Sequence, residues 1–205
     1  MSPLVTLPGG QLRDEIRQAV YDTIIQQAAE SPIATRSFFS AVQGKALYLT
    51  NLRQNNLLET AVSFRVQGLA LDAQNIYEAN KNLLALVVEN SSIQLRVGEK
   101  VYFQSPLTFV TGRVDNSGAI SRSSGTGEAA GSVVGMLHQK MGQSAVAPVV
   151  FTGRHCIDIL PLQSFTADFV CSGLSAAEIA LATPAANTKV SYLFSLKGLL
   201  RRPVQ

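Results

Sequence analysis

Histidine, cysteine and tryptophan are the residues of which this sequence has least. Its 205 residues contain two histidines, two cysteines and no tryptophan. Cys156 and Cys171 lack the close spacing of a disulfide scaffold or a zinc motif, so we expect both to be buried free thiols. His155 adjoins Cys156, but neighbouring strand residues point to opposite faces, which is a poor geometry for a catalytic couple. His138 is expected in solvent or at an interface, so the sequence predicts no metal site.

Three glycines, Gly125, Gly127 and Gly131, do not form a phosphate-binding motif. A dinucleotide-binding loop places its glycines directly between a strand and a helix, and a P-loop continues with Gly-Lys-Ser/Thr. Neither context occurs here, and residues 115–135 are instead interpreted as a flexible loop rich in Ser and Gly. The sequence therefore predicts no cofactor, no catalytic residue and no enzyme activity.

Charged residues are also scarce, at 15% of the chain against 46% for hydrophobic residues. This balance argues against disorder and is typical of a protein whose surface is partly covered by partners. The net charge of +3 equals the charge of Lys197, Arg201 and Arg202 near the C-terminus. A modest basic tail over residues 198–205 is therefore predicted, and sequence-specific nucleic-acid binding is not.

Long hydrophobic runs are missing as well. The longest purely apolar run, residues 83–88, is far shorter than the roughly 20 residues that a membrane-spanning helix needs. The first residues lack the basic and apolar regions of a signal peptide. We therefore expect no membrane-spanning segment and synthesis in a cytoplasm.

Two segments, residues 60–67 and 189–197, alternate between apolar and polar side chains. A period of two residues is typical of half-buried β-strands. Both patterns end at a glycine, Gly68 and Gly198, where a bulge or a bend is expected. We predict that the two segments pair antiparallel in one sheet.

Six further segments are predicted to be strands: residues 92–97, 101–103, 107–110, 147–151, 155–160 and 164–171. Gly98 and Glu99 join the first two as a hairpin. Eight strands at this spacing predict an all-β fold, a single eight-stranded antiparallel jelly-roll sandwich. Helices are predicted over residues 75–89, inserted after the first strand, and over residues 176–182.

Residues 11–30 are predicted to form an amphipathic helix outside the sandwich, because their apolar residues recur every four positions: Leu12, Ile16, Val20 and Ile24. Residues 33–57 follow as an extended connector, which in a compact protein is expected to contact something. The predicted organisation is thus an arm, helix and connector over residues 1–57 and a jelly-roll domain over residues 58–205.

Aromatic residues of the strands are expected in the core rather than stacked on bases. The N-terminal helix is expected to pack against protein rather than a membrane, because acidic neighbours offset its arginines. The candidate partner contacts are Arg13, Arg17, Phe38, Phe39, Arg201 and Arg202.

Three short segments together resemble one known family. They are Phe38-Phe-Ser-Ala-Val-Gln-Gly-Lys45 with Thr50-Asn-Leu52, then Leu95-Arg-Val-Gly-Glu-Lys-Val-Tyr-Phe103 followed by Ser105-Pro-Leu107, and finally residues 196–205. These are similar to the entry segment, the central hairpin and the terminal strand of jelly-roll capsid proteins of tailless icosahedral bacteriophages, many of which enclose a membrane.

Many members of that lineage carry two jelly rolls, whereas 205 residues accommodate one. The resemblance therefore implies the single-barrel branch, in which separate barrels assemble into pseudo-hexameric capsomers. It implies no catalytic residues, because the work of such a protein is structural.

The expected function is that of a structural virion protein, a single jelly-roll capsid subunit located in the virion and made in the host cytoplasm. Its expected partners are copies of itself and other capsid proteins, with an internal membrane or another anionic surface as a further contact of the N-terminal helix or C-terminal tail. One alternative is a carbohydrate- or receptor-binding jelly roll, which usually exposes Trp or Tyr. Another is a cupin-like enzyme, which needs a histidine-rich metal site.

Overall fold

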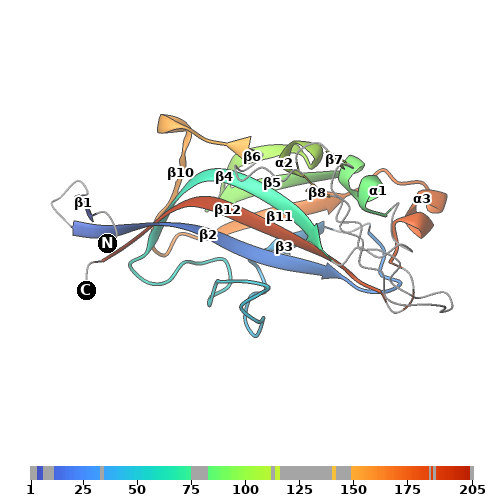
Figure 1. Ribbon diagram of the computed structural model, residues 1–205, viewed down its shortest axis with the longest axis horizontal. Helices are drawn as coiled ribbons and strands as arrows, with labels where there is room; N and C mark the ends of the chain where they lie inside the picture. The colour runs from blue at the N-terminus through green and yellow to red at the C-terminus, as the bar shows by residue number, and fades with distance from the viewer. Residues whose placement is uncertain are drawn as a thin grey trace.

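The computed structural model describes residues 4–6, 12–32, 35–74, 83–111, 114–115, 140–141, 149–184, 186 and 188–203 (Figure 1). Strands predominate in these residues, and the sheets are antiparallel, so the chain is an all-β protein. The described helical segments are short: α1 (Leu83–Glu89), α2 (Thr108–Thr111), the 3-10 turn η2 (Gly153–His155) and α3 (Ala176–Leu181).

The larger sheet, sheet A, contains the longest strands. Its order is β1 (Leu4–Thr6), β2 (Leu12–Gln26), β12 (Val190–Pro203), β4 (Ser63–Gln74) and β10 (Ile157–Ile159), with β9 (Val149–Val150) also paired to β4. In Figure 1 the ends of β2 and β12 that lie near the two chain termini, with β1 beside β2, extend beyond the other described strands.

The second sheet, sheet B, has the order β3 (Thr35–Phe38), β11 (Phe165–Cys171), β5 (Ser91–Val97) and β6 (Lys100–Pro106). A separate two-stranded pair joins β7 (Val114–Asp115) to β8 (Lys140–Met141). The expected hairpin is confirmed, because β5 pairs antiparallel with β6 across Gly98 and Glu99.

The main strands pair in a nested order. The outermost pair is β2 with β12, followed by β3 with β11 and β4 with β10, and the innermost is the hairpin of β5 and β6. Successive pairs alternate between sheets A and B, and the innermost lies in sheet B. Both before and after the β5–β6 hairpin, the chain therefore crosses repeatedly between sheets A and B, which share one core.

The core lies between the sheets and is rich in aromatic rings. In β11, residues 165, 167, 169 and 171 are buried and the residues between them are partly exposed, which is the predicted two-residue period. Phe38 and Phe39 lie 5.3 Å and 6.1 Å, between ring centroids, from Phe194 of sheet A, and Phe39 also lies 5.1 Å from Phe165. Removing these rings from water is the main contribution to the stability of the folded chain.

The two alternating segments lie in neighbouring antiparallel strands of one sheet, β4 and β12, as predicted, but they do not pair with each other. Both strands continue past their glycines, so the register differs from the one expected: Ser63 to Val66 face Arg201 to Gly198, and residues 68–74 face residues 197–191. The register shifts between Lys197 and Gly198, which places an irregularity at the glycine, as predicted.

The prediction of an N-terminal helix over residues 11–30 is wrong. Residues 12–26 form β2, which pairs with β12 along nearly its whole length and belongs to the sandwich. A spacing of four residues is even, so it keeps side chains on one face of a strand as well as on one face of a helix. The β-branched residues Val20, Thr23 and Ile24 favour the strand.

The prediction of a strand over residues 107–110 is also wrong, because α2 begins at Thr108. Leu107 and Val110 are buried and the two residues between them are exposed, a spacing that suits a helical turn. The helix predicted over residues 176–182 is confirmed by α3, and α1 confirms residues 83–89 of the other. Residues 75–82, His138 and residues 116–135 of the predicted loop lie outside the described residues.

Candidate interaction surfaces

The described part of the chain contains no cluster of three or more His, Cys, Asp or Glu side chains that could hold a metal ion. His155 is exposed at the end of η2, and the Cys156 thiol lies 3.5 Å from the carbonyl oxygen of Phe151. Cys156 is half-buried and Cys171 is buried, and both are free thiols. The surfaces that could contact other molecules are described next.

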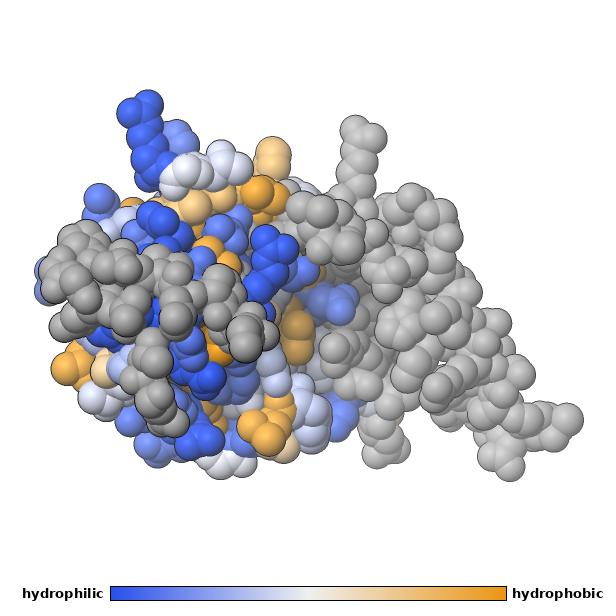
Figure 2. All heavy atoms as spheres, turned by 60° about the vertical axis from the view of Figure 1, so that its left-hand side comes forward, coloured by the Kyte–Doolittle hydropathy of each residue, from blue (hydrophilic) through white to orange (hydrophobic). Residues whose placement is uncertain are grey.

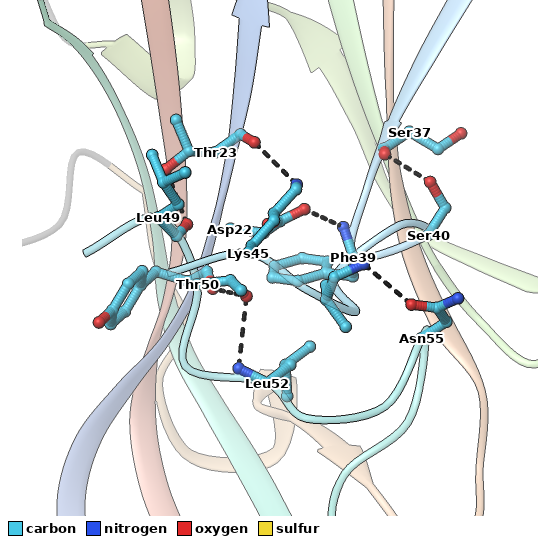
Figure 3. Close-up of polar contacts among 12 residues, drawn as sticks. Asp22, Thr23, Ser37, Phe39, Ser40, Lys45, Leu49, Thr50, Leu52 and Asn55 are labelled. Carbon is cyan, nitrogen blue, oxygen red and sulfur yellow. Dashed lines mark hydrogen bonds and ion pairs between the residues drawn. The ribbon is translucent and has the colours of Figure 1, made fainter. Parts of the chain in front are cut away.

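Residues 35–38 of the predicted connector are not a connector, because they form β3; the rest of it, residues 39–57, is fastened to sheet A by a buried carboxylate (Figure 3). Asp22 is fully buried in β2, where its two oxygens accept hydrogen bonds from the Lys45 ammonium group and from the Phe39 backbone N–H, both at 2.7 Å. Lys45 also donates to the Thr23 carbonyl at 2.9 Å. A buried charge is costly unless it is paired and hydrogen-bonded, and this arrangement provides both.

The same connector covers the outer edge of β2. The Asn51 side chain accepts a hydrogen bond from Tyr21 N–H at 2.9 Å and donates to the Ala19 carbonyl at 2.7 Å. The Thr50 hydroxyl donates to the Tyr21 carbonyl at 2.9 Å. These groups replace a neighbouring strand, so this stretch of sheet edge is closed to pairing with another chain. The expected contact of the connector is therefore with its own sheet.

The tip of the connector carries an exposed apolar pair. Leu47 and Tyr48 are 79% and 75% exposed, although the Leu47 carbonyl accepts a hydrogen bond from the Tyr21 hydroxyl. Two more exposed leucines, Leu160 and Leu162, follow β10. Figure 2 shows apolar residues as separate spots among hydrophilic ones on the face that it presents. Small spots of this kind suit modest contacts rather than one large interface.

Two of the predicted partner contacts are corrected by their burial. Phe38 and Phe39 are both fully buried in the aromatic core. They therefore offer no side-chain surface to a partner. Phe39 has a positive φ of 70°, a conformation that aims its N–H at Asp22 and its ring into the core.

The predicted basic contacts lie on the ends of β2 and β12 and are mostly paired. Arg201 donates to Glu15 at 2.7 Å, and Arg202 lies 3.7 Å from Asp14. The Arg13 guanidinium donates to the Ala61 carbonyl. Acidic residues of β2 therefore neutralise much of the predicted basic tail, whereas Arg17 is exposed.

A buried polar pair closes one end of the core. The Tyr192 hydroxyl donates to the Gln26 side-chain oxygen at 3.1 Å, and Gln26 donates to the Glu30 and Ala182 carbonyls at 2.9 Å and 3.2 Å. Burial raises the pKa of the Tyr192 phenol well above its ordinary value, because the phenolate would be deprived of water. The pair stabilises the fold and is too enclosed to contact a partner.

Comparison with protein-family models, with curated proteins and with solved structures found no match. In the described residues, no helix has both the length and the apolar character needed to cross a membrane.

Proposed function

We propose that the protein is a structural virion protein, a single jelly-roll capsid subunit that assembles with copies of itself and with other capsid proteins into the shell of an icosahedral phage. In this proposal the protein acts by shape and burial, and it resides in the virion after synthesis in the host cytoplasm. Many repeated modest interfaces then add up to a durable container.

The nested strand order is the observation that carries the proposal. A jelly roll is a long antiparallel hairpin rolled so that its pairs alternate between two sheets. The pairs β2 with β12, β3 with β11, β4 with β10 and β5 with β6 follow that scheme. A fold alone does not assign a function, so the capsid role also depends on the resemblance of three segments.

The places of those three segments in the fold support the proposal. The segment 38–45 runs from the end of β3 to Lys45 and fastens the connector to Asp22. The segment 95–103 spans the turn of the β5 and β6 hairpin. Residues 196–203 are the end of β12, the central strand of sheet A. Each segment therefore serves the architecture, as expected of a family whose work is structural.

The exposed apolar tip suggests where neighbouring subunits could meet. Leu47 and Tyr48 project at the end of a connector that is otherwise held firmly on β2. A membrane contact through an N-terminal helix is no longer part of the proposal, because residues 12–26 are a strand.

The test is to measure the mass of the purified protein over a range of concentrations by light scattering and to image it by negative-stain microscopy, alone and with the products of neighbouring genes. We expect regular assemblies larger than the 21.9 kDa chain, and we expect the protein in particles from its natural source by mass spectrometry. Only stable monomers, together with absence from particles, would contradict the proposal.

A pair of variants tests the tip directly. Leu47→Asp with Tyr48→Asp is expected to reduce assembly at least about tenfold, because burying either carboxylate at an interface is costly. Glu99→Gln, in the exposed β5–β6 turn, is the matched control and is expected to assemble normally. Both proteins should retain the thermal stability of the parent, since all three residues are exposed. Normal assembly of the double variant would exclude the tip as a contact.

A further inference from the structure

A hollow of about 590 Å³ lies on sheet A, on the side facing away from the core. It is lined by residues of the four strands β2, β4, β9 and β12 and of the segment between β9 and β10: Arg17, Gln18, Ala19, Gln67, Gly68, Val150, Phe151, Thr152, Gly153, Cys156, Lys197 and Gly198. Its volume falls within the range of small-molecule sites in proteins. The proposed capsid role does not require it.

The strand register explains why the sheet is hollow there. Ala19, Lys197, Gly68 and Val150 lie opposite one another across β2, β12, β4 and β9. Two of these four residues have little or no side chain, so space remains above the backbone. The Phe151 N–H donates to the Gln67 carbonyl at 2.7 Å and fixes one wall against β4.

The charge of the hollow is positive and unbalanced. Arg17 and Lys197 line it, and no acidic residue does. On the same face of the sheet, Arg65 pairs with Asp158 at 3.1 Å and Arg201 pairs with Glu15 at 2.7 Å. Among the residues that the structure describes, Arg17 and Lys197 have no such acidic partner. Lys197 is half-buried, so an anion that paired with it would offset a real desolvation cost.

The uncharged residues of the lining indicate the chemistry of the uncharged part of a ligand. Val150, Phe151 and Ala19 offer apolar contact, and Gln18, Gln67 and Thr152 offer hydrogen bonds. In a small-molecule site the apolar lining contacts the body of the ligand, and a few polar groups fix its orientation.

We propose that this hollow binds a small organic carboxylate with an apolar body. The carboxylate pairs with Lys197 and Arg17, and the apolar body lies against Val150 and Phe151. The inference is independent of the capsid role, since it depends on the hollow alone.

The probe is 2-naphthoate, with the uncharged 2-naphthylmethanol as the matched ligand, and the readout is affinity by isothermal titration calorimetry on the full chain. Naphthoate is expected to bind one site per chain and at least about tenfold more tightly than the alcohol, the ratio that one charge-assisted hydrogen bond supplies. Lys197→Met keeps the apolar stem and is expected to reduce that advantage, leaving the part supplied by Arg17, without changing the affinity for the alcohol. Lys189→Met, an exposed lysine before the other end of β12, is the control.

A second variant tests the space rather than the charge. Ala19→Leu fills the hollow and is expected to weaken both ligands at least about tenfold while leaving Lys197 in place. The location is checked at Cys156, whose alkylation by iodoacetamide should slow when naphthoate is bound. Equal naphthoate affinity in the parent and in Lys197→Met would overturn the proposal. So would binding that is lost whenever the protein assembles, because a neighbouring chain would then occupy the hollow.

Discussion

Replacing Gly198 by alanine is expected to destabilise the protein strongly, because the added methyl group would collide with the backbone of the neighbouring strand. A Cβ atom at this position would lie 1.9 Å from the carbonyl oxygen of Arg65 and 2.9 Å from its carbonyl carbon. It would also lie 3.1 Å from the Phe64 ring, which belongs to the core. To bring the added Cβ atom to 3.0 Å from the Arg65 carbonyl oxygen, β12 and β4 must move apart by about 1.1 Å.

The expected cost follows from that displacement. Overpacking of a well-packed site costs about 1–3 kcal/mol, and the loss of about two backbone hydrogen bonds adds about 1 kcal/mol each. The free energy of unfolding should therefore fall by about 3–5 kcal/mol. For a chain of this length, each kcal/mol lowers the melting temperature by about 2–4 °C, so Tm should fall by about 6–20 °C.

The assay is urea and thermal unfolding followed by circular dichroism, with Gly44→Ala as the control. Gly44 has a positive φ of 80° and open space around its Cβ position, so alanine there costs only the left-handed backbone penalty of about 1–2 kcal/mol. The comparison separates steric collision from backbone conformation. If Gly198→Ala proved no less stable than Gly44→Ala, the reasoning about the strand contact would be refuted.

Three further predictions concern polar groups. Lys45→Met should lower the free energy of unfolding by about 2–4 kcal/mol, because it leaves the buried Asp22 carboxylate without its cation. In a double-mutant cycle measured by denaturation, the double variant Asp22→Asn with Lys45→Met should recover part of that loss. The raised pKa of Tyr192 means that the folded state keeps its proton where the unfolded state releases it, so stability should decline above about pH 10, and Tyr192→Phe should flatten that decline in unfolding measured against pH. The side-chain hydrogen bond from Ser175 lowers the pKa of Glu178, so Ser175→Ala should raise that pKa in an NMR titration. The stabilisation that Glu178 gives to the start of α3 should be lost as the pH falls and its carboxylate is protonated. An unchanged pKa in Ser175→Ala would contradict the capping geometry.

The parts of the fold that the sequence predicted were those encoded by local alternation. The pattern of Val62, Phe64 and Val66 predicted a strand, and that of Tyr192, Phe194 and Leu196 predicted its neighbour, because side chains of two-residue period report a buried face directly. The glycine after each pattern correctly indicated an irregular register.

The parts that it missed depend on distant partners. The apolar residues of β2 fit a helix and a strand equally well, and the decision comes from β12, which is far along the chain. No local pattern marks Asp22 as buried, because its burial depends on Lys45 and on the Phe39 backbone N–H, which lie farther along the chain. The hollow also had no sequence signal, since its residues come from segments that only the sheet brings together.

The nested pairing has a consequence for the order in which the chain can acquire its structure. The hairpin of β5 and β6 joins close neighbours, whereas the Arg201 to Glu15 ion pair joins residues 186 positions apart. During synthesis β2 is among the first strands to emerge, and β12 is the last of the described strands. We therefore expect the apolar face and one edge of β2 to stay exposed until β12 has been synthesised. Folding should accordingly be slow, and the nascent chain should be most prone to aggregation just before β12 leaves the ribosome.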